Sequence, residues 1–164
     1  MQETTTVGQY LLKAVKAIGI QTVYGIPGDF IIKFFKQIEQ DPELKLVSLS
    51  HEPSVGFAAI GAARATQKPQ VACVTYGPGA LNMVNAVACA YAERVPLVVI
   101  AGGPALAVRE SGFLVHHTIK DSATQRGVYS EVTAKAVVLD NSKTAAVQIA
   151  EALAVCLDRM LPVY

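Results

Sequence analysis

The chain has 164 residues, which is the size of about one domain. Hydrophobic residues make up 52% of the chain and charged residues only 16%, so we expect a globular protein with part of its surface covered by another domain or chain. The net charge is +1 and no run of lysine or arginine occurs, which excludes an electrostatic case for binding nucleic acid or an anionic membrane.

Membrane insertion and secretion are not expected from the sequence. Residues 69–92 carry no charge and could span a bilayer by length, but Gly77-Pro78-Gly79 interrupts the stretch. Residues 1–6 have neither a basic segment nor an apolar one, so no secretory signal is expected. The three cysteines are odd in number and lack Cys-x-x-Cys spacing, which favours reduced, buried thiols in a cytoplasmic protein.

Hydrophobic periodicity predicts helices and strands that alternate along the chain. Apolar residues at helical spacing indicate helices, and short runs of β-branched or small apolar residues indicate strands. Gly19 and Pro53 mark the end of one helix and the start of another. In chain order we predict helix 7–18, strand 21–24, helix 30–38, strand 44–49, helix 53–66, strand 71–76, helix 80–93, strand 97–101, a long loop 102–117, helix 119–128, strand 136–139 and helix 142–160.

This order predicts a three-layer, doubly wound α/β fold of the flavodoxin-like kind. Strands that are apolar throughout and are joined by helices indicate a mainly parallel sheet covered on both faces. In such sheets the ligand crevice lies at the carboxyl ends of the strands. The polar turns 27–29, 50–52 and 76–79 each follow a strand, so we expect them to meet at one edge. Residues 161–164 resemble the start of a further strand.

A single carboxylate, Glu52, stands in an apolar setting between a predicted strand and a nonpolar helix. Such a group must reach water, find a hydrogen-bond partner or keep its proton. Carboxylic acids in these surroundings often transfer protons. The alternative interpretation is an ordinary acid in the first turn of a helix, where the helix dipole favours it.

Four motifs occur in a fixed order. They are Gly25-Ile26-Pro27-Gly28-Asp29-Phe30, His51-Glu52-Pro53, Thr75-Tyr76-Gly77-Pro78-Gly79-Ala80-Leu81-Asn82 and His116-His117. Their order and spacing resemble the N-terminal pyrimidine-binding domain of thiamine diphosphate-dependent 2-oxo acid decarboxylases, and the resemblance extends over essentially the whole chain. Within that family the chain is most similar to the pyruvate, indolepyruvate and phenylpyruvate decarboxylases. Residues 30–35 and 76–79 resemble the phenylpyruvate and indolepyruvate branch slightly more.

The resemblance implies non-oxidative decarboxylation of a 2-oxo acid to an aldehyde and carbon dioxide. It implies that Glu52 lies against N1′ of the cofactor's aminopyrimidine ring in a dry site and shares a proton with it. Asp29, His116 and His117 match the family's proton-handling set. Consecutive residues of an extended loop point to different sides, so one imidazole could face the substrate while the other pairs with Asp29. The alternatives are an exposed polar loop for the histidines and a helix N-cap for Asp29.

The resemblance also implies a set of residues beside the aminopyrimidine ring. Glycine lets backbone approach the ring closely, and proline removes an N–H group that would need a partner. The set is Pro27, Gly28, Glu52, Thr75, Gly77, Pro78, Gly79 and Asn82. The alternative for the Gly-Pro-Gly segment is an ordinary strand-to-helix turn. It is not a phosphate-binding loop, because no lysine follows at the required spacing.

The family holds magnesium and the diphosphate with a Gly-Asp-Gly segment and a later asparagine in a C-terminal domain, and Gly28-Asp29-Phe30 is not that motif. The resemblance therefore implies one pyrimidine-binding domain over residues 1–164, with the central and diphosphate-binding domains absent. No residue here is assigned to a metal ion, and Mg²⁺ is assigned to the absent domain. Thiamine diphosphate would be shared with the diphosphate-binding domain of a neighbouring subunit in a homo-oligomer, a dimer or tetramer, and the isolated chain would be inactive.

Three other functions stay open at this point. An acetolactate synthase-type enzyme shares the glutamate and the Gly-Pro-Gly turn, although the paired histidines favour the decarboxylases. A non-catalytic, stand-alone domain that binds a partner is the second alternative. A flavodoxin-like nucleotide-binding protein is the third, and it is supported by analogy of fold alone.

Overall fold

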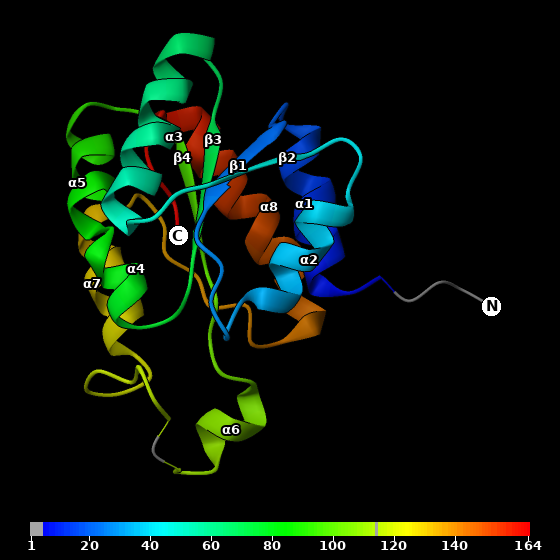
Figure 1. The fold of residues 1–164 in the computed structure, drawn as a ribbon, viewed down its shortest axis with the longest axis vertical. Helices are drawn as coiled ribbons and strands as arrows, with labels where there is room; N and C mark the ends of the chain where they lie inside the picture. The colour runs from blue at the N-terminus through cyan, green and yellow to red at the C-terminus, as the bar shows by residue number, and fades with distance from the viewer. Residues whose placement is uncertain (1–4, 114) are drawn as a thin grey trace.

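The computed structural model describes residues 5–113 and 115–164, so Leu114 and residues 1–4, part of the segment considered for a secretory signal, lie outside the described residues (Figure 1). The strands are β1 (Thr22–Gly25), β2 (Lys45–Ser48), β3 (Gln70–Val74) and β4 (Leu97–Ala101). The helices are α1 (Val7–Ala17), α2 (Ile32–Gln40), α3 (Glu52–Thr66), α4 (Pro78–Asn82), α5 (Val84–Ala92), α6 (Leu106–Glu110), α7 (Thr124–Val132) and α8 (Ser142–Arg159).

The four strands form one parallel sheet in the order β2-β1-β3-β4. In the centre of the sheet, Val23 of β1 is paired with Val71 of β3. Beyond β4 the pairing continues through single bridges, because Val163 pairs in parallel with both Val98 and Lys135. All four strands therefore present their carboxyl ends at one edge, which confirms the predicted mainly parallel α/β sheet.

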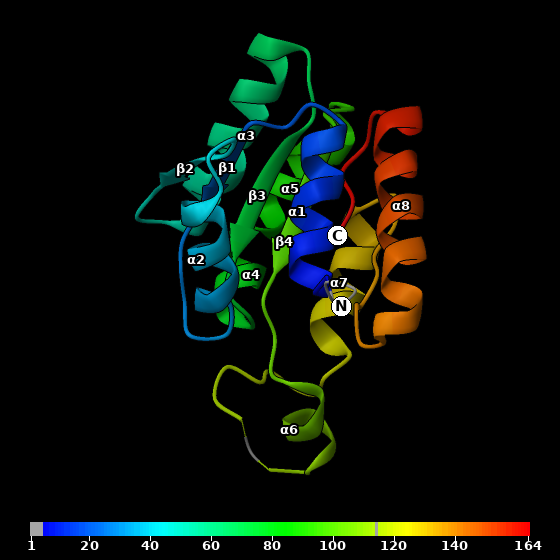
Figure 2. The same cartoon turned by 90° about the vertical axis from the view of Figure 1, so that its right-hand side faces the viewer.

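Helices cover both faces of the sheet, and each face has its own apolar core. Figure 1 shows α3, α4, α5 and α7 on one side and α1, α2 and α8 on the other, and Figure 2 shows the same layers from the side. Strand β3 is buried along its full length, so its successive residues enter different cores, whereas the edge strand β2 has no fully buried residue. Val71 and Cys73 pack towards α1, α2 and α8, whereas Ala72 and Val74 pack towards α3, α5 and α7.

The predicted helix 80–93 is two helices, and this prediction is corrected by the structure. Helix α4 ends at Asn82, and Met83 lies between it and α5. The Met83 N–H donates to Ala80 O at 3.1 Å, an i to i−3 bond that tightens the last turn of α4. Met83 is fully buried beneath the junction. Asn82 and Asn85 lie on either side of the junction, but polar residues also occur on the exposed side of a continuous helix, so they do not predict this break.

Three further predictions differ from the structure between β4 and α8. The predicted loop 102–117 contains the short helix α6, whose residues are mostly exposed and so show no helical periodicity. The helix predicted over 119–128 is α7, which begins at Thr124 because Asp121 closes a turn before it by accepting from the Ala123 and Thr124 N–H groups. The structure assigns no strand to residues 136–139. Instead, the neighbouring Lys135 forms a single bridge with Val163.

The expectation of buried cysteines is confirmed for two of the three. Cys73 and Cys156 are buried and Cys89 is half-buried, and all three are free thiols. Burial raises the pKa of the Cys156 thiol to about 12, so this group stays protonated near neutral pH. Among the described residues, no helix combines the length and the apolar character needed to cross a bilayer.

Candidate functional site

The turns at the carboxyl edge of the sheet are in direct contact. A Cβ atom on Gly28, in the turn after β1, would lie 2.6 Å from Thr75 Oγ1, in the turn after β3. A Cβ atom on Gly79 would lie 2.8 Å from Thr75 Cγ2 and 3.2 Å from Glu52 Oε1. Glycine at both positions is therefore what lets the three turns approach each other. The meeting of these turns, expected from the topology, is present in the structure.

Glu52 is the first residue of α3, and it is half-buried rather than enclosed by the described residues. Its Oε2 accepts a hydrogen bond from Asn82 Nδ2 at 2.8 Å. The position at a helix N-terminus, followed directly by Pro53, favours the negative charge. Of the three expected outcomes for this carboxylate, the structure shows a hydrogen-bond partner together with partial access to water.

Thr75 packs closely against both Gly28 and Gly79 beside Glu52. Thr75 Oγ1 is buried and has no hydrogen-bond partner among the described residues. Buried hydroxyls are usually paired, so an unpaired one next to a cradle of glycines suits a ligand with donor and acceptor groups. Glu52 Oε1 lies beside the same glycine cradle. The carboxylate oxygen Glu52 Oε1 beside the half-buried Gly28 and Gly79 fits the polar edge of the aminopyrimidine ring that the family resemblance implies.

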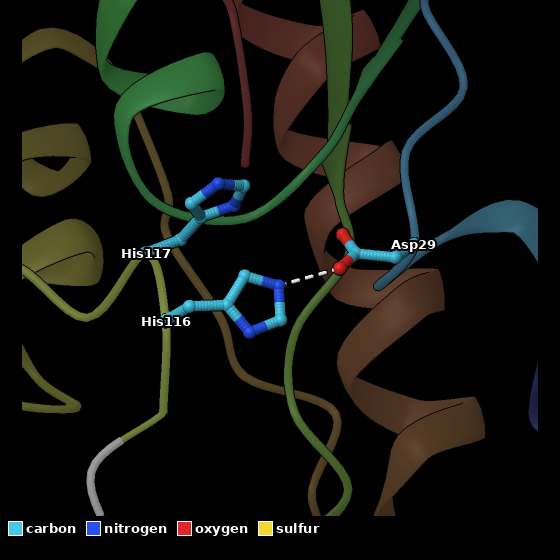
Figure 3. Close-up of side chains that lie close together, drawn as sticks. All are labelled: Asp29, His116 and His117. Atoms are coloured by element: carbon cyan, nitrogen blue, oxygen red, sulfur yellow. Dashed lines mark hydrogen bonds and ion pairs between the residues drawn. The ribbon is translucent and has the colours of Figure 1, made fainter.

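A second group of side chains, Asp29 with His116 and His117, lies at the same edge (Figure 3). His116 Nε2 lies 2.5 Å from Asp29 Oδ2, and Asp29 Oδ1 accepts from the Phe30 N–H at 3.1 Å. The hydrogen bond from His116 is the main cause that lowers the pKa of the Asp29 carboxyl below its ordinary value. Asp29 is not the N-cap of α2, because that helix begins at Ile32 with Ile31 as its N-cap.

The paired histidines lie in a tight turn, and the expected extended loop is therefore wrong. The Thr118 N–H donates to Val115 O at 3.2 Å, and His117 has a φ of 68°, in the left-handed region. The two imidazole centroids are 4.8 Å apart, so both rings lie on the same side of the site. The prediction that one imidazole pairs with Asp29 is confirmed for His116.

Gly77 holds this turn against the rest of the site. Its φ is +75°, and a Cβ atom there would lie 2.1 Å from His117 O. The Gly77 N–H donates to Gln125 Oε1 at 2.7 Å. Gln125 is buried in α7, and its Nε2 donates to the Tyr164 hydroxyl at 2.5 Å. Gln125 could not be found from the sequence, because its partner Gly77 lies 48 residues away along the chain and no local pattern signals the bond.

The structure thus brings the predicted residues into two adjoining groups. The first contains Gly28, Glu52, Thr75, Gly79 and Asn82, and the second contains Asp29, His116 and His117 with Gly77 behind them. Neighbouring residues of one turn join the groups, because the turn after β1 supplies both Gly28 and Asp29. Pro27 and Pro78 are exposed beside them. The catalytic and binding roles of all these residues stay predictions.

Similarity to known proteins identifies the family of this chain. Residues 5–136 match the family described as "Thiamine pyrophosphate enzyme, N-terminal TPP binding domain". The chain is 48% identical over 154 residues to an indole-3-pyruvate decarboxylase from Azospirillum brasilense, covering 94% of this chain and 28% of that protein. It is 36% identical to a pyruvate decarboxylase from Aspergillus parasiticus, covering 98% of this chain and 28% of that protein. The chain therefore spans little more than a quarter of the length of these relatives, and it belongs to the thiamine pyrophosphate enzyme family, whose N-terminal domain it matches.

Proposed function

We propose that this chain is the pyrimidine-binding domain of a decarboxylase that converts a 2-oxo acid to an aldehyde and carbon dioxide. The observation that carries the proposal is the position of Glu52, held by Asn82 and with Oε1 beside the glycine cradle around Thr75. The relatives named as indole-3-pyruvate and pyruvate decarboxylases support the same reaction class. The paired histidines favour this class over the acetolactate synthase-type alternative.

Thiamine diphosphate, when bound, supplies the nucleophilic carbon and accepts the electron pair released with carbon dioxide. Within this chain, Glu52 holds a proton between its carboxylate and N1′ of the aminopyrimidine ring. Asn82 fixes the rotamer of Glu52 by donating to Oε2, which leaves Oε1 for that exchange. The backbone at Gly28 and Gly79, which Thr75 holds in place by packing against both glycines, would orient the ring.

His116 and His117 deliver and remove protons on the substrate side of the site. Asp29 accepts from His116 Nε2, which fixes the ring orientation and favours a proton on that nitrogen. His117 lies 4.8 Å from His116, ring centroid to ring centroid, so the two imidazoles can act in sequence on one small substrate. The Phe30 ring packs 4.8 Å from that of His116 and gives this side of the site an apolar wall.

The proposal assigns diphosphate and metal binding to a domain outside this chain. A diphosphate-binding domain of a neighbouring subunit holds the diphosphate and Mg²⁺, and the active enzyme is a homo-oligomer in the cytoplasm. The 52% content of hydrophobic residues supports an extensive contact with other domains. The 2-oxo acid is aromatic, as in indole-3-pyruvate, which the relative from Azospirillum brasilense is named for.

The test is Glu52→Gln in the full-length protein that carries this domain, which removes the exchangeable proton and keeps the shape. We expect kcat/KM for aldehyde formation to fall by about 10²- to 10⁴-fold, the usual contribution of acid–base catalysis. Glu39→Gln, an exposed carboxylate of α2, is the matched control and should leave the rate unchanged.

Indolepyruvate, phenylpyruvate and pyruvate should be compared as substrates, with product identity read by chromatography. Unchanged turnover in Glu52→Gln would contradict the role of Glu52. Acetolactate as the main product from pyruvate would instead support the synthase alternative. Absence of any turnover in the unaltered full-length protein would favour a non-catalytic domain.

A further inference from the structure

Gln125 is a nearly fully buried polar side chain in the first turn of α7. Its Oε1 accepts from the Gly77 N–H at 2.7 Å, and its Nε2 donates to the Tyr164 hydroxyl at 2.5 Å. The chemistry of the partners fixes the orientation of the amide, because the Gly77 N–H can only donate and therefore has to face the oxygen. Gln125 thus joins the turn after β3 to residues 162–164 beside β4.

The Gly77 end of this connection lies directly behind the paired histidines. Gly77 is buried, and its backbone is so close to the 115–118 turn that a Cβ atom there would lie 2.1 Å from His117 O. A buried N–H without a partner costs free energy, so a chain that lacks the Gln125 oxygen gains by moving Gly77 towards another acceptor. Because the two backbones are in contact, such a movement of Gly77 displaces His117.

We propose that Gln125 is a positioning residue, which holds the Gly77 backbone and through it sets the place of the His117 imidazole. Gly77 also leads into Gly79, which lies against Glu52, so the same bond fixes the spacing between the two groups of the candidate site. The catalytic consequence of this spacing rests on the proposed function, in which Glu52 and the histidines act on one cofactor and one substrate.

The other partner of Gln125 is itself held firmly. The Tyr164 ring stacks on the Tyr129 ring, with centroids 4.1 Å apart, and burial raises the pKa of the Tyr164 hydroxyl, so it stays neutral. The Tyr129 hydroxyl donates to Ala80 O at 2.6 Å. Helix α7 therefore bonds to the segment 77–80 at two points, Gly77 and Ala80, and Figure 1 shows α7 beside α4.

The first test compares Gln125→Met with Gln125→Glu in the 164-residue chain by NMR of the imidazole protons. Methionine is similar in length but offers the Gly77 N–H no oxygen, whereas a buried glutamate that keeps its proton restores one. We expect the His116 and His117 signals to shift in Gln125→Met and to return towards their original positions in Gln125→Glu. His51, the third histidine of the chain, is the internal reference.

Thr133→Val is the matched control for a lost hydrogen bond in the same helix. Thr133 is also nearly fully buried, and its hydroxyl donates to Tyr129 O at 2.7 Å, away from the Gly77 turn. We expect this variant to leave the histidine signals in place. Equal shifts in Thr133→Val and Gln125→Met would show that α7 acts only through general packing, and would overturn the proposal.

Tyr164→Phe gives a milder version of the test, because it removes the partner of Gln125 Nε2 and leaves the bond to Gly77. The His117 signal should shift in the same direction as in Gln125→Met, and by less. Where Gln125→Met does not fold, Tyr164→Phe decides alone. A His117 signal that stays in place in the folded variants would overturn the proposal.

The second test measures turnover in the full-length protein that carries this domain. We expect Gln125→Met to lower kcat for aldehyde formation by about 10- to 100-fold and to change KM by less than about twofold, because misplaced groups lose orientation rather than substrate binding. Gln125→Glu should recover part of the rate, and Thr133→Val should keep all of it. A raised KM with unchanged kcat would contradict the positioning role. Absence of turnover in the unaltered protein would count against the proposed function alone, since the NMR test needs none.

Discussion

The two halves of the candidate site are held in place by different means. Glu52 and Thr75 lie within a few residues of strand ends, and glycines bring their turns into van der Waals contact. His116 and His117 lie in the long connection between β4 and α7, where the Asp29 carboxylate and the Phe30 ring contact them. The first half is therefore fixed by the sheet itself, and the second depends on a handful of specific bonds.

This difference predicts which substitutions lower the free energy of unfolding and which change only the arrangement of the site. Around Glu52, added volume meets buried atoms of the core on that face of the sheet, and close-packed interiors tolerate such volume poorly. Around the histidines, the side chains are exposed, so a change there should alter the site with little effect on the free energy of unfolding. Gly77 is the exception, because it connects the two halves.

Gly77→Ala should have the largest effect. The new Cβ atom would lie 2.1 Å from His117 O, and the φ of +75° is strained for alanine. We expect a loss of about 2–4 kcal/mol in the free energy of unfolding, from backbone strain and steric overlap together. Urea denaturation measures the loss, and NMR of the imidazole protons should show a displaced 115–118 turn. Gly103→Ala, where a Cβ atom meets nothing within 4 Å, is the control. Equal stability of the two variants would show that Gly77 does not join the halves.

Two glycines of α3 sharpen the comparison within the helix that carries Glu52. A Cβ atom on Gly56 would lie 2.4 Å from Ala86 Cβ, whereas a Cβ atom on Gly61 meets nothing within 4 Å. We expect Gly56→Ala to destabilise the fold by about 1–3 kcal/mol through overpacking. Gly61→Ala should stabilise it by about 0.5–1 kcal/mol, because alanine favours a helix over glycine. Thermal and urea unfolding measure both changes. The same sign for both variants would refute the tight packing of α3 on α5.

The smallest effect concerns the charge of Asp29. The hydrogen bond from His116 lowers the pKa of the carboxyl below its ordinary 3.8, so its contribution to stability is present above about pH 3.8 and is lost as the pH falls through the lowered value. In His116→Ala the pKa of Asp29 should rise towards the ordinary value, measured by NMR titration of the side-chain carboxyl carbon. Asp121, whose pKa is lowered mainly by the Thr124 hydroxyl, should keep its value in that variant. An unchanged pKa of Asp29 would show that the bond does not persist in solution.

Much of the fold could be predicted because strands such as β3 and β4 are largely apolar. A strand such as β3, buried along its full length, indicates a sheet covered on both faces, and the parallel connections then place the turns at one edge. The break at Met83 and the short helix α6 could not be predicted. The first lies in a mostly apolar stretch whose polar residues Asn82 and Asn85 are also compatible with one continuous helix, and the second has an exposed surface without helical periodicity.

The parts of the site that could be predicted are those that follow from the topology of the sheet. The contacts of Gly28 and Gly79 with Thr75 follow from strands that end side by side. The orientation of the histidines did not follow, because a single positive φ at His117 turns an expected extended pair into a tight turn. Gln125 was not predicted because it contributes to the site through a long-range hydrogen bond from the Gly77 N–H, which no local sequence pattern indicates.

The bridges beyond β4 have a consequence for the behaviour of the chain in concentrated solution. Residues 162–164 exchange backbone hydrogen bonds with Leu97 and Val99 on one side and with residues 134–137 on the other. They thereby cover an outer edge of the sheet that would otherwise offer unpaired amides and carbonyls to another molecule. At the β4 side of the sheet, these three residues therefore leave no free strand edge of β4 for another molecule to pair with.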